Sequence, residues 1–366
     1  MDRVAYQKKV SDYFSAACVE MALQLARNTG ILDVLFSAEQ PLTSVEIAEQ
    51  GKLKERYVRE ILGALAVSEI IQVDDTSTKF HVPNHHKKVL QTLAVIGKAA
   101  PIIGSRMEVM TDIVSKDGPA GIPFGEPEFN WLKETKMLTQ DAFIDGDLLG
   151  CLPEIKSQLE QGIHVCEFGC ANGIVLLNLA ARYPKSTFVG SDISKSSLDQ
   201  AQNVAVERGL GNIKFEVHDL TDLPDAINNS FDWVFLQDTL HDLPSPGKAM
   251  QGVKRSLKKG ATASFVDLGM QGKLADNRGN LFWAQMYTFG SFFCVPGSLV
   301  QSKDAEAFGP CWGVEKTRQL INEAGLSVVK EDFSRRSPGF VHYVCKCGVN
   351  KVGVDSELAK VTTSKI

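Results

Sequence analysis

The chain has 366 residues, of which 44% are hydrophobic and 23% are charged. This composition is close to the average of globular proteins and excludes a disordered, collagen-like or coiled-coil chain, and the length suits about two domains. The formal net charge is −5. Because nucleic acid and anionic membrane surfaces attract a positive field, neither is an expected partner.

The cysteines and the apolar stretches indicate in which cellular compartment the protein is expected. Eight cysteines are too few for a disulfide scaffold, and no two are spaced as Cys-x-x-Cys. We therefore expect buried, reduced thiols and no metal site. The N-terminal residues lack the apolar core of a signal peptide. The longest apolar stretch, residues 93–104, is interrupted by Lys98 and Pro101 and is too short to cross a bilayer. These features predict a cytoplasmic protein.

Residues 1–90 are expected to form a small helical domain that ends in a hairpin. A first helix is predicted over residues 13–27. Thr43, with Glu46 three residues later, is typical of a capping box and predicts the start of a second helix. A third, amphipathic helix follows, and residues 70–82 contain two short strands around a polar turn. This order of elements is that of a winged helix.

A winged helix often binds DNA, but the charges of the third helix argue against that function. Residues 52–69 carry four basic and three acidic side chains. Binding to phosphates needs a larger excess of positive charge. We therefore favour a packing or dimerisation module, and DNA binding is the alternative.

From residue 161 to residue 348, strand-like runs alternate with helical ones. This alternation predicts an α/β domain with a parallel sheet that is covered by helices on both faces. The expected strands are residues 163–168, 187–191, 213–217, 233–236, 261–267, 326–331 and 340–345.

The remaining segments flank or interrupt this domain. Residues 91–160 are expected to form a helical connector and lid, with a Gly/Pro-rich break at residues 118–127. An aromatic, glycine-rich cap insert at residues 270–312 is expected either to roof an apolar pocket or to be part of the core. The polar tail, residues 349–366, is expected to be flexible.

The first expected strand of the α/β domain ends in the sequence EFGCANG. Glycines at such a point allow a sharp turn and a close approach of a ligand to the backbone. The dinucleotide pattern G-x-G-x-x-G fits poorly, because Ala171 and Ile174 occupy its second and third glycine positions. The pattern acidic-x-G-x-G-x-G fits better, with one glycine replaced by alanine. Its four positions are Glu167, Gly169, Ala171 and Gly173.

With this motif, residues 161–346 resemble the class I S-adenosylmethionine (SAM)-dependent methyltransferases. The resemblance implies a Rossmann-like seven-stranded sheet, preceded here by a mainly helical winged-helix domain, and SAM as the cofactor. It implies that the motif residues hold the methionine part of SAM. Asp192, 23 residues after Gly169, would accept hydrogen bonds from the ribose hydroxyls.

The resemblance also implies roles for residues after two further strands. Asp219 and Leu220 fall where the family contacts adenine, and Gln237 falls where the family closes over the methionine part. Because all these residues follow strands of one sheet, they are expected at the same edge. For Asp192 and Asp219, the alternative role is that of helix N-caps.

The winged helix makes the resemblance more specific. Small-molecule O-methyltransferases of the plant type carry such a domain for dimerisation, and so does a broader, largely uncharacterised group, which residues 308–326 resemble most. The resemblance implies a homodimer and a small organic methyl acceptor.

His241 is the candidate catalytic base. Methyl transfer to a hydroxyl usually needs a base, and an ordinary histidine titrates in the right range. Plant-type relatives have His-Asp at this position followed by Trp, whereas this chain has Leu243 after Asp242. His241 is therefore either the base, with Asp242 as a residue that orients it, or a structural or substrate-orienting residue. Transfer to oxygen is favoured, and transfer to nitrogen or carbon is open.

Two other functions are alternatives. One is a non-enzymatic regulator that senses SAM or binds DNA through its winged helix; the other is an NAD(P)-dependent oxidoreductase, which the loop spacing disfavours. The chain ends in Ser364, Lys365 and Ile366, one conservative change from the Ser-Lys-Leu peroxisomal signal. The peroxisome is therefore the alternative to the cytoplasm.

Overall fold

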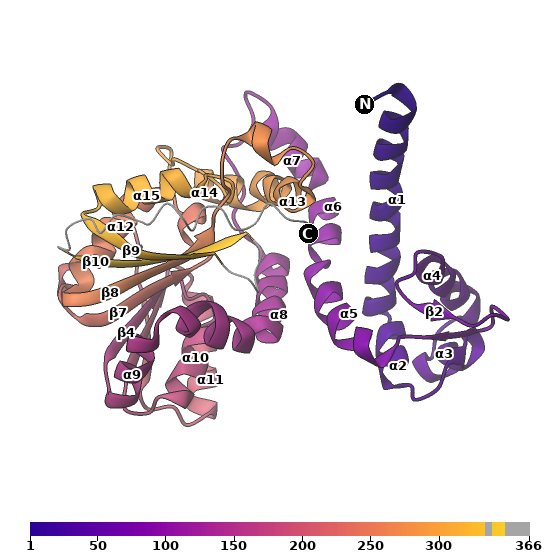
Figure 1. The fold of residues 1–366 in the computed structure, drawn as a ribbon, viewed down its shortest axis with the longest axis horizontal. Helices are drawn as coiled ribbons and strands as arrows, with labels where there is room; N and C mark the ends of the chain where they lie inside the picture. The colour runs from indigo at the N-terminus through magenta and orange to yellow at the C-terminus, as the bar shows by residue number, and fades with distance from the viewer. Residues whose placement is uncertain (334–338, 348–366) are drawn as a thin grey trace. The chain divides into compact units, whose positions relative to one another are not determined.

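The computed structural model describes residues 1–333 and 339–347. The chain divides into two compact units (Figure 1). One comprises Met1–Thr111 and Gly125–Leu138, and the other comprises Asp112–Phe124 and Thr139–Ile366. The expected connector is thus divided between them. The terminal Ser-Lys-Ile sequence and the tail from residue 349 onward lie outside the described residues.

The first unit contains the predicted winged helix. Helix α1 (Arg3–Asn28) starts well before residue 13, because Asp2 caps it by accepting a hydrogen bond from the Ala5 backbone N–H. The predicted capping box is present at the start of α3 (Ser44–Gly51). The short helix α2 (Ile31–Ser37) was not predicted, since seven residues show no clear helical period.

The next helix and the wing complete this domain. Helix α4 (Glu55–Val67) buries the four apolar residues of its predicted face: Val58, Ile61, Leu62 and Leu65. The two predicted strands are present but shorter than expected, as β2 (Gln72–Val73) and β3 (Lys79–His81). A further strand that was not predicted, β1 (Leu42–Thr43), pairs with β3 and gives an antiparallel sheet in the order β1-β3-β2.

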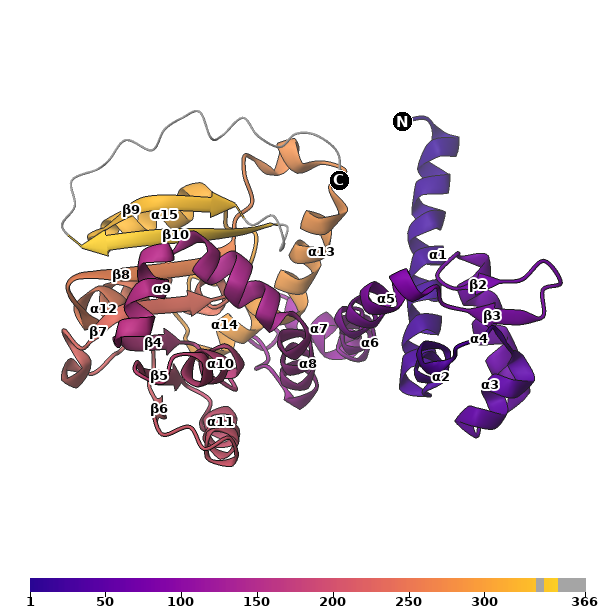
Figure 2. The same cartoon turned by 60° about the horizontal axis from the view of Figure 1, so that its bottom comes forward.

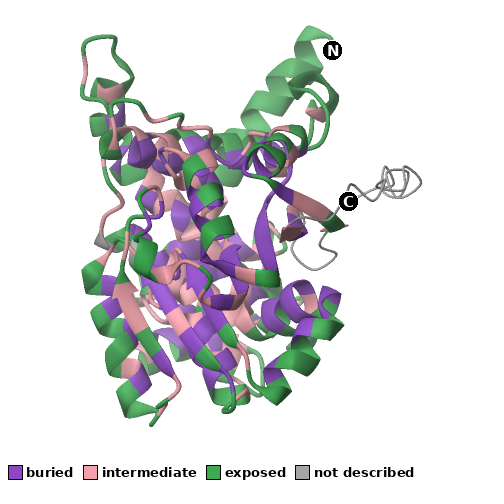
Figure 3. Ribbon diagram, turned by 90° about the vertical axis from the view of Figure 1, so that its left-hand side faces the viewer, coloured by how far each residue is buried: buried purple, intermediate pink, exposed green. Residues whose placement is uncertain are grey.

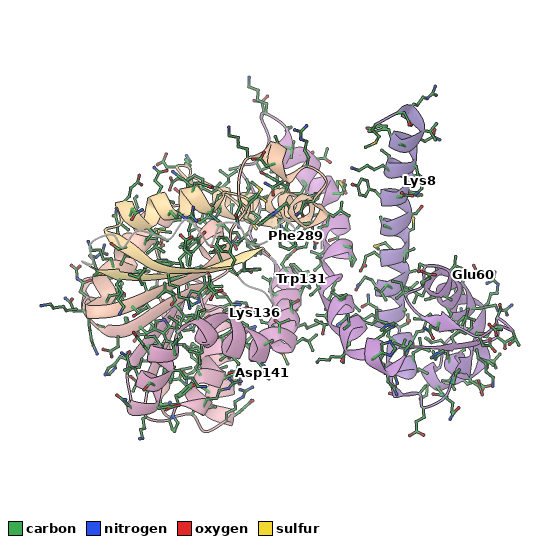
Figure 4. The ribbon with its side chains drawn as sticks, viewed as in Figure 1. Lys8, Glu60, Trp131, Lys136, Asp141 and Phe289 are labelled. Atoms are coloured by element: carbon green, nitrogen blue, oxygen red, sulfur yellow. The ribbon has the colours of Figure 1, made fainter. Side chains whose placement is uncertain are left out.

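Further helices follow the wing. They are α5 (Asn84–Ile96), α6 (Ala99–Ser105), α7 (Met107–Val114) and α8 (Glu126–Ala142). The predicted Gly/Pro-rich break lies between α7 and α8. Within the first unit, Arg106 Nε and Glu128 Oε1 form a buried ion pair at 2.7 Å, and Trp131 on α8 (Figure 4) donates a hydrogen bond to the Ile96 carbonyl. No helix among the described residues is long and apolar enough to cross a membrane.

The second unit is built on the predicted seven-stranded sheet, in the order β6-β5-β4-β7-β8-β10-β9. The predicted parallel sheet has one exception, because β10 is antiparallel to both of its neighbours. Only six residues separate β9 from β10, and a parallel connection needs a dozen or more. The strands are β4 (His164–Phe168), β5 (Thr187–Asp192), β6 (Ile213–Val217), β7 (Phe231–Gln237), β8 (Leu257–Leu268), β9 (Leu326–Phe333) and β10 (Phe340–Cys347).

Helices cover both faces of this sheet, as predicted (Figures 1 and 2). On one face, α9 (Pro153–Gln161), α10 (Ile174–Arg182) and α11 (Lys195–Glu207) share a hydrophobic cluster with Val165 and Trp233. On the other face, α12 (Pro246–Ser256) and α15 (Val314–Glu323) pack against Cys166 and Val234, which follow Val165 and Trp233 on the same strands. Figure 3 shows the strands of the sheet largely buried between these layers.

The insert at residues 270–312 is mainly helical. It contains α13 (Leu281–Phe289), a π-helix (Gly290–Cys294) and α14 (Val295–Gln301). Trp283 and Met286 on α13 are buried with Leu268 and Met270, and Phe289 (Figure 4) packs against this cluster. These aromatic residues therefore contribute to the core. All eight cysteines are free thiols, five of them buried.

Candidate active site

The predicted site residues meet at one edge of the second unit. Strands β6, β5, β4 and β7 are parallel neighbours, so their carboxyl ends lie side by side. Glu167 lies near the end of β4, Asp192 ends β5, Asp219 follows β6, and Gln237 ends β7. In open α/β sheets this edge is where ligands bind.

The loop after β4 alternates between ordinary and left-handed backbone conformations. Gly169, Ala171 and Gly173 have φ angles of 73°, 49° and 63°. Glycine adopts this region without strain, whereas an L-residue such as Ala171 pays roughly 1–2 kcal/mol. The conformation of Ala171 is held by a hydrogen bond from its backbone N–H to Asp192 Oδ2 at 2.8 Å.

Asp192 joins the ends of two neighbouring strands. Besides the bond from Ala171, its Oδ1 accepts a hydrogen bond from the Ser194 backbone N–H at 2.9 Å. The N-cap of α11 is Ser194, so the alternative role of Asp192 as the cap of this helix is wrong. Asp219 makes a local turn instead, because its Oδ1 accepts hydrogen bonds from both the backbone N–H and the hydroxyl of Thr221. The side chain of Leu220 is buried in the core.

The glycines of the loop are required by packing as well as by conformation. A Cβ atom on Gly169 would lie 2.4 Å from Thr239 Cγ2, and one on Gly173 would lie 2.5 Å from Phe215 Cε1. Both distances are far below van der Waals contact. These glycines were expected to allow the close approach of a ligand, and side chains of the protein itself also approach them.

Two buried acceptor atoms at this edge have no hydrogen-bond partner among the described residues: Gln237 Oε1 and Asn172 Oδ1. Most buried polar atoms in proteins are paired, and an orphan acceptor indicates a missing donor such as a ligand. Gln237 was among the predicted residues, whereas Asn172 was not, although it lies within the predicted loop. The two acceptors are therefore available to a group that carries N–H or O–H donors.

His241 lies in a short 3₁₀ turn (Leu240–Asp242) directly after β7 and is 4% exposed. Its Nδ1 is 2.5 Å from Oδ1 of Asp267, and its backbone N–H donates to Oδ2 of the same carboxylate. Asp267 is 1% exposed. The expectation that Asp242 orients His241 is wrong: Asp242 Oδ1 is 3.5 Å from Nε2, too far for a good hydrogen bond.

Two protein-family models match the sequence of the chain. Residues 159–294 match the model of a methyltransferase domain, and residues 17–92 match an Rv2258c-like winged helix-turn-helix domain. The chain carries a methyltransferase domain. The predicted combination of this domain with an N-terminal winged helix is thereby confirmed.

Individual relatives match parts of the chain in sequence or the whole chain in fold. The ubiquinone biosynthesis O-methyltransferase of Paracidovorax citrulli is 29% identical over 113 residues, 31% of this chain and 47% of that protein. The chain spans about half the length, or less, of the first three curated relatives that it matches.

Solved structures cover nearly the entire chain. Human N-acetylserotonin methyltransferase in complex with SAM has a TM-score of 0.65 at 17% identity, covering 95% of this chain and 99% of that one. PigF with S-adenosylhomocysteine (SAH) has a TM-score of 0.68 at 15% identity, covering 94% and 99%. The predicted fold class is therefore confirmed.

In the methyltransferase domain, the charges around His241 favour its protonated form. Burial alone lowers the pKa of His241, but the carboxylates of Asp267 and Asp242 outweigh burial and raise the pKa well above its ordinary value. These charges therefore stabilise the imidazolium form of His241. The neighbouring thiol of Cys294, at the end of the π-helix, is neutral, because burial raises its pKa to about 12.

Asp267, the hydrogen-bond partner of His241, was not among the predicted residues. The acid lies 26 residues further along the chain, near the end of β8. Strands β7 and β8 are parallel neighbours with Gln237 beside Val266, and this register places Asp267 next to the turn that follows β7. An acidic residue near the end of a buried strand was the available signal, but the strand order was needed to use it.

Proposed function

We propose that the protein is a SAM-dependent methyltransferase that methylates a small organic acceptor at oxygen. The observation that carries the proposal lies at the carboxyl edge of β4, β5 and β7. There Asp192 accepts a hydrogen bond from Ala171 in the loop after β4, and the buried acceptors Asn172 Oδ1 and Gln237 Oε1 have no partner among the described residues. The match of residues 159–294 to a methyltransferase domain supports it. A regulator or an NAD(P)-dependent oxidoreductase has no comparable support.

The donors of SAM suit the acceptors of this edge. The ammonium group of its methionine part carries donors for Asn172 Oδ1 and Gln237 Oε1. Glu167 and the loop after β4 would line the same part of the site. A carboxylate accepts about four hydrogen bonds, and Asp192 uses two for the backbone, so it retains capacity for ribose hydroxyls. Asp219 and Leu220 remain the proposed adenine contacts. When bound, SAM supplies an activated methyl group on a sulfonium.

Cofactor binding tests this proposal directly. We expect calorimetric titration to give micromolar Kd values for SAM and SAH and no binding of NAD⁺. Gln237→Leu removes the orphan acceptor and should weaken SAM binding about 10- to 100-fold, which is the effect of one hydrogen bond to a charged group. Gln251→Leu, at an exposed position of α12, is the matched control. A folded, ligand-free protein that binds neither SAM nor SAH would contradict the proposal.

The proposed base is His241, in the protonation state that lacks the Nε2 proton. Asp267 accepts the hydrogen bond from Nδ1 and thereby leaves Nε2 as the nitrogen that takes the acceptor proton. Asp267, not Asp242, is the orienting residue in this proposal. The similarity to the ubiquinone biosynthesis O-methyltransferase of Paracidovorax citrulli supports transfer to oxygen.

The proposed partner of α1 is a second copy of the chain. Tyr6, Val10 and Phe14 recur every fourth residue and are 63%, 51% and 72% exposed, so they form an apolar stripe along one side of the helix. Figure 3 shows the start of α1 exposed. A shallow groove lined by Cys18, Gly63 and other residues lies between α1 and α4. An exposed stripe of this kind is typical of a protein interface.

Oligomeric state tests the homodimer. We expect light scattering after size-exclusion chromatography to give twice the mass of the chain. Phe14→Asp places a charge in the stripe and should shift the protein to the monomer, whereas Ser15→Asp, at an exposed position on another side of α1, should leave the dimer intact. A wild-type monomer at micromolar concentration would contradict this proposal.

A further inference from the structure

Three metal-binding side chains meet beside the proposed base. They are His241, Asp242 and Cys294, and one ligand atom of each lies within 4.8 Å of the others. His241 and Asp242 come from the turn after β7, while Cys294 comes from the end of the π-helix in the insert. This cluster could not be predicted from the sequence, because its cysteine lies 53 residues after its histidine and outside any Cys-x-x-Cys pair.

Cys294 forms side-chain hydrogen bonds with both His241 and Asp242, and the separation of His241 and Asp242 matches that of two ligands on one metal ion. Nε2 of His241 and Oδ1 of Asp242 are 3.5 Å apart. A hydrogen bond between an imidazole and a carboxylate is shorter, at roughly 2.7–2.9 Å. Two nitrogen or oxygen ligands, each about 2.1 Å from a tetrahedral zinc ion, lie about 3.4 Å apart. The observed separation therefore leaves room for a metal ion between the two side chains.

The hydrogen bond of His241 to Asp267 is typical of a histidine that binds a metal ion. Its Nδ1 is 2.5 Å from the Asp267 carboxylate, which also accepts a hydrogen bond from the Leu268 backbone N–H. Histidines that bind metals are usually oriented in this way by a carboxylate on the other ring nitrogen.

We propose that His241, Asp242 and Cys294 form a site for a divalent transition metal ion, with Zn²⁺ as the best match. Nitrogen, thiolate sulfur and carboxylate oxygen are the three ligand types of zinc sites, and three protein ligands leave one position open. The thiol of Cys294 loses its proton to solvent on coordination.

Such a site would regulate the methyltransferase domain. A metal ion on Nε2 occupies the lone pair that must take the acceptor proton, so Zn²⁺ inhibits methyl transfer and a chelator restores it. The inhibition rests on the proposed role of His241 as the base, whereas the metal binding does not.

Cobalt is the probe for the site, because Co²⁺ replaces Zn²⁺ and a bound thiolate gives it a charge-transfer absorption in the near ultraviolet. We expect the full-length, chelator-treated protein to show this band and to saturate at one Co²⁺ per chain, with loss of the band when Zn²⁺ is added. Cys294→Ser should abolish the band. Cys18→Ser, which removes the exposed thiol of α1, should leave it unchanged.

Two results would overturn the metal site: no charge-transfer band in the wild-type protein, or a band that persists in Cys294→Ser. If Cys294→Ser does not fold, Asp242→Asn provides the decision, because it keeps the thiolate and should weaken Co²⁺ binding at least tenfold. The titration needs neither SAM nor an acceptor. Failure of the metal site is therefore distinguishable from failure of the proposed activity.

Discussion

Replacing His241 by Ala is expected to lower kcat for methyl transfer by a factor on the order of 10²–10⁴, the usual contribution of a general base. The Kd of SAM should stay within about twofold, because the proposed cofactor contacts lie on the β4 loop, Asp192 and Gln237. The measurement is SAH formation with a phenolic acceptor taken from a screen, beside calorimetry with SAM. His164→Ala, at an exposed position at the start of β4, is the matched control.

The pH profile separates a base from a merely structural histidine. A base acts only when unprotonated, and the pKa of His241 is raised well above its ordinary value by Asp267 and Asp242, against the effect of burial. Activity should therefore increase with pH, and the midpoint should lie well above 6.5. Asp267→Asn removes the main negative charge that raises the pKa of His241. It should move this midpoint to lower pH while kcat falls. Full activity in His241→Ala, or a midpoint that Asp267→Asn does not move, would contradict the assignment.

The parts of the site that follow a single strand could be predicted from the sequence. Gly169 and Gly173 are visible because a left-handed backbone conformation selects glycine, and Asp192 because a carboxylate ends the next strand. The strands themselves are visible because both faces of a covered sheet are apolar. Local backbone conformation and burial select particular residue types, so both can be predicted from the sequence.

The parts that depend on the pairing of distant segments could not be predicted. Asp267 reaches His241 only because β7 lies beside β8 in one register, and Cys294 reaches it only because the insert folds back as a π-helix. Asp242, the neighbour in sequence, was the candidate partner of His241, yet its Oδ1 lies 3.5 Å from Nε2, too far away for a good hydrogen bond. The antiparallel direction of β10 likewise depends on how β9 and β10 are connected.

Replacing Asp192 by Ala is expected to weaken SAM binding about 100-fold or more. Each hydrogen bond from a ribose hydroxyl to a carboxylate is worth about 1.5–3 kcal/mol, and the substitution removes the acceptor for both. It also removes the bond that holds Ala171 in its left-handed conformation, so the loop loses its preorganised shape. Calorimetric titration with SAH, which does not react, measures the affinity without turnover.

The two contributions of Asp192 are separable with a second variant. Asp192→Asn retains one side-chain oxygen for the Ala171 N–H but lacks the charge that ribose hydroxyls favour, so its loss of affinity should be intermediate. Asp199→Ala, which removes an exposed carboxylate paired with Lys195 on α11, should bind SAH like the wild-type protein. Unchanged affinity in Asp192→Ala would place the ribose elsewhere. Equal losses in Asp192→Ala and Asp192→Asn would assign the effect to the charge and not to the shape of the loop.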